Sequence, residues 1–144
     1  MVTFESGQER RDDIGALLMA AELPHEDIDA HLGDFIVAVD GGHLVGVVGL
    51  ERVSDGVGLL QSLAVTPDRR GTGVGILLCN ALVKDARRLG LHKLYLLTTT
   101  AAPFFARRGF AKIERADVGR ALERTREWSE LCPSTATVMA LRLE

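Results

Sequence analysis

The chain has 144 residues, of which 47% are hydrophobic and 26% are charged, and this composition predicts one globular domain over residues 1–144. Its 17 lysine and arginine residues against 20 acidic residues give a net charge of −3, which argues against a nucleic-acid partner bound through bulk positive charge. No apolar run reaches the length of a membrane span, and the two cysteines, Cys79 and Cys132, show no metal-ligand spacing, so we expect a cytoplasmic protein with no metal site and no membrane partner.

The first half of the chain predicts a helix followed by a meander of strands. Apolar residues at helical spacing predict a helix over residues 8–21, which Pro24 ends. Glycine-containing turns at residues 40–42 and 54–56 separate apolar, β-branched segments and therefore predict hairpins. The elements expected in this half are a strand over residues 2–5, helices over 8–21 and 25–32, and strands over 35–39, 44–53 and 57–65.

The second half alternates helices with strands. Residues 73–89 place apolar side chains on one helical face and basic residues near the C-terminal end, and Gly90 follows as a typical residue after a helix. The elements expected are a helix over residues 73–89, a strand over 93–99, a short helix over 103–108, a strand over 110–115, a helix over 117–131 and a strand over 137–143. This order predicts an α/β or α+β domain with a mixed sheet.

A glycine-rich stretch, DRRGTGVG, runs from Asp68 to Gly75 between a predicted strand and the longest predicted helix. Glycines before a helix allow an anion to approach unpaired backbone amides, and arginines add positive charge. The P-loop pattern fails because Ile76 and Leu77 follow Gly75, and the dinucleotide pattern fails because it requires glycine at position 76. The pattern [QR]-x-x-G-x-[GA] fits in full from Arg70 to Gly75, and the alternative is an ordinary glycine-rich connector.

The stretch resembles the pyrophosphate loop of the GNAT acetyltransferase superfamily, which binds acetyl-CoA. Two longer blocks, LQSLAVTPDRRGTGVGILL and LYLLTTTAAPFFARRGFAKI, resemble the core of that superfamily. The segments GLERV and TREWSELCPSTATVMALRL look like acetyltransferases associated with arsenic-resistance operons, and the middle block is similar to N-acetylglutamate synthase domains. The resemblance implies the GNAT fold, with a mixed, mostly antiparallel central sheet, flanking helices and a splayed pair of parallel strands.

The resemblance also implies acetyl-CoA as a co-substrate. Its pantetheine arm is expected to lie between the strands predicted over residues 57–65 and 93–99, and its pyrophosphate to bind the amides of residues 71–76. The residues implied for cofactor binding are Leu63, Ala64, Val65, Arg69, Arg70, Gly71, Thr72, Gly73, Val74, Gly75, Ile76, Thr99, Phe104 and Phe105.

The implied reaction moves an acetyl group directly to an amine, so a base must remove a proton from the acceptor. Glu51, at the end of an apolar strand, is the candidate base, and the alternative is an ordinary surface glutamate. A backbone N–H near Leu63 is the candidate donor to the thioester carbonyl. Many family members have a tyrosine as general acid where this chain has Phe105, so either the thiolate leaves unassisted or Ser62 or Cys132 donates the proton.

The similarity to N-acetylglutamate synthase domains implies a small, amino-acid-like amine as the acceptor. The residues implied for its pocket are Arg115, Arg126, Trp128, Cys132, Ser134 and Thr135. The alternative is that Arg126 and Trp128 only cover the sheet and that Cys132 is a small buried residue. We therefore predict an acetyl-CoA-dependent N-acetyltransferase, with a homodimer as the candidate assembly. The alternatives are a non-catalytic acyl-CoA sensor and an acetyltransferase for protein N-termini or lysines.

Overall fold

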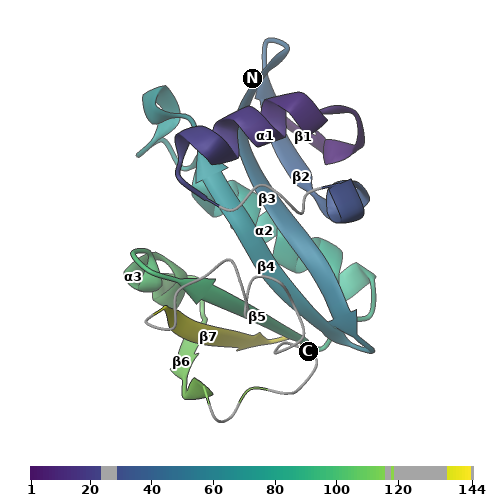
Figure 1. Ribbon diagram of the computed structural model, residues 1–144, viewed down its shortest axis with the longest axis vertical. Helices are drawn as coiled ribbons and strands as arrows, with labels where there is room; N and C mark the ends of the chain where they lie inside the picture. Colours follow the sequence, from purple (N-terminus) through teal and green to yellow (C-terminus); the bar gives the residue numbers. More distant parts are fainter. Residues whose placement is uncertain (24–28, 116–117, 119–135, 144) are drawn as a thin grey trace. The chain divides into compact units, whose positions relative to one another are not determined.

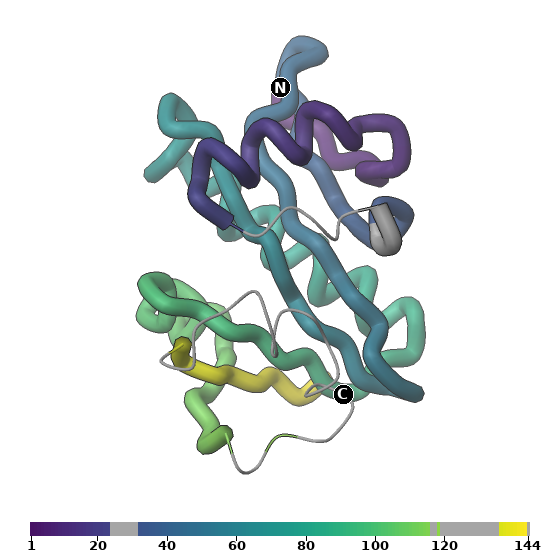
Figure 2. The backbone as a smooth tube through the Cα atoms, viewed as in Figure 1, coloured from purple at the N-terminus to yellow at the C-terminus, as the bar shows by residue number. Residues whose placement is uncertain are grey.

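The computed structural model describes residues 1–23, 29–115, 118 and 136–143 (Figure 1), and Figure 2 follows the same chain as a tube. The elements in these residues are β1 (Val2–Ser6), η1 (Gly7–Glu9), α1 (Arg11–Ala20), η2 (Asp29–Asp34), β2 (Ile36–Asp40), β3 (His43–Ser54), β4 (Val57–Val65), η3 (Pro67–Arg69), α2 (Val74–Arg88), β5 (Lys93–Thr98), α3 (Ala102–Arg107), β6 (Ala111–Ile113) and β7 (Thr137–Arg142). All the predicted strands are confirmed to within two residues at each end, and so are the helices predicted over residues 73–89 and 103–108.

Two predicted helices differ from those in the structure, and a third predicted helix lies almost wholly outside the described residues. The helix predicted over residues 8–21 is divided into η1 and α1 because Arg10 leaves helical geometry, with φ −119° and ψ 25°. There its side chain reaches Glu5 Oε1 and the Gly42 carbonyl, each at 3.3 Å. The described part of the segment predicted over residues 25–32 belongs to the 3₁₀ helix η2, which is a correction to that prediction. The helix predicted over residues 117–131 lies outside the described residues, apart from residue 118.

The strands form one seven-stranded sheet in the order β1-β2-β3-β4-β5-β7-β6. β2 is antiparallel to both β1 and β3, and β7 is antiparallel to both β5 and β6. β4 and β5 are parallel, with residues 57–59 opposite 93–95. The chain passes through α2 between them and so returns to the end of the sheet at which β4 begins. The predicted mixed, mostly antiparallel sheet is therefore confirmed, whereas the splaying of the parallel pair stays a prediction.

The chain groups into two compact units, which are described separately below. Unit 1 comprises Met1–Glu51 and Leu60–Asp85, and unit 2 comprises Arg52–Leu59 and Ala86–Glu144. The strands β3 and β4 contribute residues to both units. The prediction of one domain over residues 1–144 stays a prediction.

In unit 1, α1 and α2 cover opposite faces of the sheet (Figure 1). The alternation of side chains along a strand explains this arrangement, because neighbouring residues point to opposite faces. Val47 of β3 packs in a buried cluster with residues of α1, whereas the preceding Gly46 faces α2. The cluster on the α1 side contains Ile14, Leu17, Leu18, Phe35, Val37, Val39, Val47 and Ala64.

Gly46 lets α2 lie close against β3, so we expect the Gly46→Ala variant to lose about 1–3 kcal/mol of unfolding free energy. An added Cβ would stand 2.7 Å from Leu78 Cδ1, 3.0 Å from Val74 Cγ1 and 3.3 Å from the Ala64 carbonyl oxygen. Urea unfolding followed by circular dichroism measures the loss. Gly33→Ala is the matched control because, of the residues that the structure describes, its Cβ would meet only the flexible end of Gln8, and equal effects at both glycines would contradict the expectation.

Unit 2 has its own core, built on the start of β4 and on β5 and β7. Its buried cluster contains Leu59, Tyr95, Leu97, Val118, Ala136 and Val138. Tyr95 is buried in this cluster, and its hydroxyl lies 3.4 Å from Lys93 Nζ. The Gly56 carbonyl accepts hydrogen bonds from the amides of His92 and Lys93, at 2.7 and 3.2 Å, so the β3–β4 turn is fixed to the start of β5.

Candidate anion-binding site

The backbone of β4 is distorted at Ser62, near the end of the strand that precedes the glycine-rich loop. Ser62 has φ +60°, in the left-handed region that costs a non-glycine residue about 1–3 kcal/mol and persists only where the surroundings impose it. Beyond it, the N–H and Oγ1 of Thr66 both donate to the Val45 carbonyl, at 2.9 and 3.3 Å. The backbone from Ser62 to Thr66, which includes the predicted residues Leu63, Ala64 and Val65, is therefore held against β3 at its far end.

A compact series of turns connects β4 to the glycine-rich loop. The Arg69 N–H donates to the Thr66 carbonyl at 3.0 Å, and the Arg70 N–H to the Pro67 carbonyl at 3.4 Å. The Arg69 carbonyl in turn accepts the Thr72 N–H at 3.3 Å and also the Thr72 hydroxyl. Because each bond spans three residues, the chain turns tightly and delivers the loop directly to the start of α2.

The loop then presents backbone amides at the N-terminus of α2. Gly71 and Gly73 have φ +78° and +92°, and in the part of the chain that the structure describes no atom lies within 4 Å of a Cβ added at either residue. The helical hydrogen bonds begin with the Leu77 N–H, which donates to the Gly73 carbonyl at 3.0 Å. Within the described residues, the amides of residues 74–76 donate no hydrogen bond. Three unpaired amides at the positive end of a 15-residue helix are hydrogen-bond donors of the kind that can bind an anion.

The two arginines of the loop point to different partners. Arg70 is exposed, and its Nε lies 3.4 Å from the Val65 carbonyl at the end of β4. The Arg69 guanidinium instead lies against Asp40 at the end of β2, with Nη1 2.7 Å from Oδ2. The hydrogen bond from Arg69 lowers the pKa of the Asp40 carboxyl below its ordinary value of 3.8, and the amino group of Met1 lowers it further. Arg69 is thus paired with a carboxylate at the end of β2, whereas the Arg70 side chain is exposed to solvent.

We expect the Asp40→Asn variant to be less stable than the natural chain near neutral pH and to approach it in acid. Because the folded state lowers the pKa of Asp40, its carboxylate stabilises the fold above pH 3.8, and this contribution disappears as the pH falls through the folded-state pKa. Urea unfolding of both proteins, at neutral pH and at the lowest pH that leaves them folded, measures the difference. A difference that stays constant with pH would contradict the assignment.

Three predicted cofactor residues belong to unit 2. Thr99 is exposed, and Phe104 is half-buried with the Arg108 guanidinium carbon 5.8 Å from its ring centroid. Phe105 is buried, and its ring meets those of Phe104 and Phe110 edge-on, at centroid distances of 5.1 and 5.7 Å. Phe105, which stands where many members of the resembled family have a tyrosine, is therefore part of an aromatic cluster.

The remaining predicted residues are placed as follows. Glu51 is half-buried near the end of β3, on the same alternate positions as Val47 and Gly49. Arg115 Nη2 donates to the Ala136 carbonyl at 3.0 Å, within unit 2. The other residues predicted for the acceptor pocket, Arg126, Trp128, Cys132, Ser134 and Thr135, lie outside the described residues.

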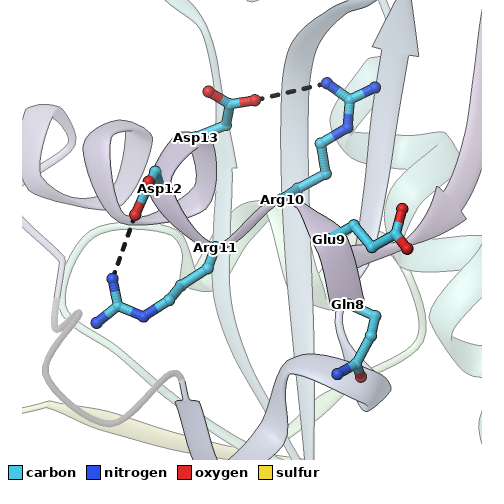
Figure 3. A pocket seen from close by; sticks show the side chains of 6 residues that line it. All are labelled: Gln8, Glu9, Arg10, Arg11, Asp12 and Asp13. Carbon is cyan, nitrogen blue, oxygen red and sulfur yellow. Dashed lines mark hydrogen bonds and ion pairs between the residues drawn. The ribbon is translucent and has the colours of Figure 1, made fainter.

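A pocket of about 430 Å³ lies at the start of α1 (Figure 3). Six consecutive residues, 8–13, line it, and none of them is a predicted site residue. Arg10 and Arg11 point away from each other, toward Asp13 and Asp12, with ion-pair distances of 3.5 and 3.4 Å. Because both arginines of this pocket are paired with aspartates of the same segment, the glycine-rich loop stays the better candidate for an anion site.

Two further features of the described residues bear on the kind of site. Among them, no three side chains of histidine, cysteine, aspartate or glutamate are grouped so as to hold a metal ion. None of the helices there is both long and apolar enough to cross a membrane.

Asp40 and Thr66 both contact Arg69 of the glycine-rich loop, and reasoning from the sequence missed both. Asp40 stands in a turn signal, Asp-Gly-Gly, and Thr66 precedes a proline, so each already had a local explanation. Their partners, Arg69 and Val45, are distant in the sequence. The sequence did show a carboxylate at the end of a predicted strand, Asp40, and an arginine beside the glycine-rich loop, Arg69. Their contact could not be predicted, because it depends on how the strands pair.

Comparison with known proteins finds a matching family and similar relatives. A model described as the acetyltransferase (GNAT) family matches residues 6–110. An amino-acid acetyltransferase of Azotobacter vinelandii is 31% identical over 138 residues, which cover 84% of this chain and 32% of that protein. An amino-acid acetyltransferase of Ralstonia nicotianae is 32% identical over 110 residues, covering 69% of this chain and 24% of that protein. The chain thus spans about a third of the first relative and less of the second.

Solved structures show the same fold. N-acetylglutamate synthase from Neisseria gonorrhoeae, complexed with coenzyme A and N-acetyl-glutamate, aligns with a TM-score of 0.87 at 22% identity, over 100% of this chain and 35% of that one. Rv2747 from Mycobacterium tuberculosis, in complex with CoA, aligns with a TM-score of 0.84 at 23% identity, over 99% of both chains. The matches therefore extend over the full seven-stranded arrangement.

Proposed function

The chain belongs to the acetyltransferase (GNAT) family, and we propose that it is an N-acetyltransferase that moves an acetyl group from acetyl-CoA to the amine of a small, amino-acid-like acceptor. One observation carries the proposal, namely the three unpaired amides of residues 74–76 behind two glycines of positive φ. A pyrophosphate needs such a set of donors without side chains in the way. The amino-acid acetyltransferases similar to this chain support the acceptor class.

The loop residues fit the pyrophosphate of acetyl-CoA. The amides of residues 71–76 hold it, apart from that of Thr72, whose N–H already donates to the Arg69 carbonyl, and Arg70 supplies a full positive charge at the rim. Backbone groups of Leu63, Ala64 and Val65 hydrogen-bond the pantetheine arm in the manner of an added strand. When bound, acetyl-CoA supplies the activated acetyl group as a thioester. Thr99, Phe104 and Phe105 stay predicted cofactor contacts.

The amide of Leu63 is the proposed donor to the carbonyl oxygen on which negative charge develops. The peptide group that carries this N–H is joined directly to Ser62, whose φ of +60° departs from extended geometry. The distortion at Ser62 therefore sets the direction of the Leu63 N–H, which gives the backbone strain a chemical purpose. A fixed backbone dipole needs no reorganisation during the reaction, so it stabilises the developing charge from the start.

Glu51 is the proposed general base, and we expect Glu51→Gln to lower kcat by about 10²- to 10⁴-fold, the usual contribution of such a base. A protonated amine cannot attack, so the acceptor must first lose a proton to this carboxylate, directly or through water. The acidic limb of the pH–rate profile should disappear in the variant. Glu114→Gln, which alters an exposed glutamate of unit 2, is the matched control, and an unchanged acidic limb would remove Glu51 from this role.

The departing thiolate has no phenol to protonate it at position 105, where the buried Phe105 ring has only carbon partners in its aromatic cluster. We propose that it leaves without a general acid, because a thiol pKa near 8.5 makes the thiolate an adequate leaving group near neutral pH. Ser62 and Cys132 are the remaining candidate donors.

Free-thiol release from acetyl-CoA, measured with a panel of amino acids and other small amines, tests the proposed function. Release that depends on an acceptor supports the enzyme. The buried Phe105 favours a second candidate, a non-catalytic acyl-CoA sensor, because it removes the family's proton donor. Tight CoA binding without acceptor-dependent release across the panel would favour the sensor, and absence of CoA binding would overturn both. Turnover with peptide N-termini or lysines alone would mean that the acceptor is a protein.

The homodimer and the cytoplasmic location stay predictions.

A further inference from the structure

Asp40 carries a role that the family resemblance does not assign. We propose that Asp40 is a positioning residue, which holds Arg69 as an anchor of the glycine-rich loop and keeps that arginine from serving as a phosphate ligand. This inference rests on the proposed function, because the loop is taken to bind the pyrophosphate of CoA. It revises the expectation that Arg69 and Arg70 act alike.

The ion pair itself is specific. Arg69 Nη1 lies 2.7 Å from Asp40 Oδ2, whereas the neighbouring carboxylate of Asp68 is 3.9 Å from Nε. The Asp40 side chain is 23% exposed and that of Asp68 is 78% exposed, so Asp40 is the better shielded partner. A short, partly shielded pair holds one geometry better than an exposed one does. Arg69 is therefore directed toward the end of β2.

The anchored residue is also the hydrogen-bonding centre of the turn. The Arg69 carbonyl accepts both the N–H and the hydroxyl of Thr72, which lies between the two glycines of positive φ. The Arg69 N–H binds the Thr66 carbonyl, and Thr66 is itself fixed to Val45 of β3. A movement of Arg69 is thus transmitted to Thr72 and to the amides that follow it. Asp40 and Val45 together attach the loop to two strands of unit 1.

The charges of the two arginines differ in consequence. The Asp40 carboxylate offsets the charge of Arg69 and also contacts the Met1 amino group at 3.0 Å, whereas Arg70 is exposed with its Nε near the Val65 carbonyl. If Asp40 only competed with phosphate for Arg69, its removal would free a cation and tighten the binding of CoA. If Asp40 positions the loop, its removal weakens binding although a negative charge has been lost. The two roles therefore predict opposite signs for one variant.

The test measures CoA binding by isothermal titration calorimetry for Asp40→Asn, Arg69→Gln and the double variant, at low and high ionic strength. We expect each single variant to bind CoA about 3- to 10-fold more weakly, and the double variant to be no weaker than the worse single one, because the two residues act as a unit. Because the double variant keeps the net charge of the natural chain, the salt dependence of its CoA binding should stay as in the natural chain, whereas Arg70→Gln should reduce that dependence. In turnover, KM for acetyl-CoA should rise while kcat is kept, and Arg69→Lys should restore part of the affinity.

The Arg11–Asp12 pair provides matched controls, because Arg11→Gln and Asp12→Asn also remove members of an arginine–aspartate pair of unit 1. These controls should bind CoA as the natural chain does. Equal or tighter binding of CoA by Asp40→Asn, or additive effects in the double variant, would overturn the positioning role. Absence of CoA binding by the natural chain would instead refute the proposed function, so the two failures are distinguishable.

Discussion

Replacing Gly73 by alanine is expected to weaken CoA binding by about 10- to 100-fold, because a conformation with φ +92° costs an alanine about 1–3 kcal/mol. Among the described residues, no atom lies within 4 Å of the new Cβ, so the expected effect comes from backbone strain and not from a clash with them. The strained peptide is expected to turn, which moves the Gly73 carbonyl away from the Leu77 N–H and misdirects the amides that follow. Calorimetric titration with CoA measures the change.

Gly90→Ala is the matched control for this substitution. Gly90 follows the other end of α2 and has φ +82°, and no atom of the described residues lies within 4 Å of the Cβ that an alanine would add there. It should show the same order of stability loss in urea unfolding without a change in CoA affinity. Equal losses of CoA affinity in both variants would mean that strain at either end of the helix disturbs the site, and would contradict the specific role of Gly73.

Reversing the charge of Arg70 is expected to weaken CoA binding by about 10²- to 10³-fold. A charge-assisted hydrogen bond to an anion contributes about 1.5–3 kcal/mol, and glutamate adds repulsion to that loss. Because Arg70 is exposed and its Nε makes one long contact with the Val65 carbonyl, the fold itself should lose little stability. Titration with CoA and the KM for acetyl-CoA measure the effect.

Arg142→Glu is the control for charge, because Arg142 is an exposed residue at the end of β7 in unit 2. It makes the same change in net charge outside the proposed site. If both reversals weaken CoA binding equally, the anion is attracted by the charge of the whole molecule and not by Arg70. High salt should reduce the effect of Arg70→Glu, since the side chain is exposed to solvent.

Local sequence signals located most of the elements and the loop correctly. The turn glycines Gly41, Gly42 and Gly56 have the positive φ that the turn signals predict, and so does Gly90 after α2. Each of these features depends on a few adjacent residues, because only glycine adopts such angles at low cost. The glycine-rich loop was identified for the same reason, since its pattern is contiguous from Arg70 to Gly75, and its binding of the cofactor stays a prediction.

Features that depend on distant partners could not be located in this way. Apolar periodicity predicted an unbroken helix over residues 8–21, but the contacts of Arg10 with Glu5 and the Gly42 carbonyl divide it. The position of β7 between β5 and β6 was likewise not predicted, because strand order is a property of the whole sheet. A hydrophobic pattern states which face of an element is buried and leaves open what covers it.

The sequence by itself determined the family, the glycine loop and the charge beside it, because spacing and glycine geometry are local properties. Only the tertiary structure decided how the two adjacent arginines differ. Arg69 and Arg70 are identical in type, yet the pairing of β2 with β3 and the attachment of Thr66 to Val45 bring Asp40 within 2.7 Å of Arg69, while Arg70 is exposed. The physical reason is that an ion pair depends on where distant strands end, and that position is set by register and packing across the sheet.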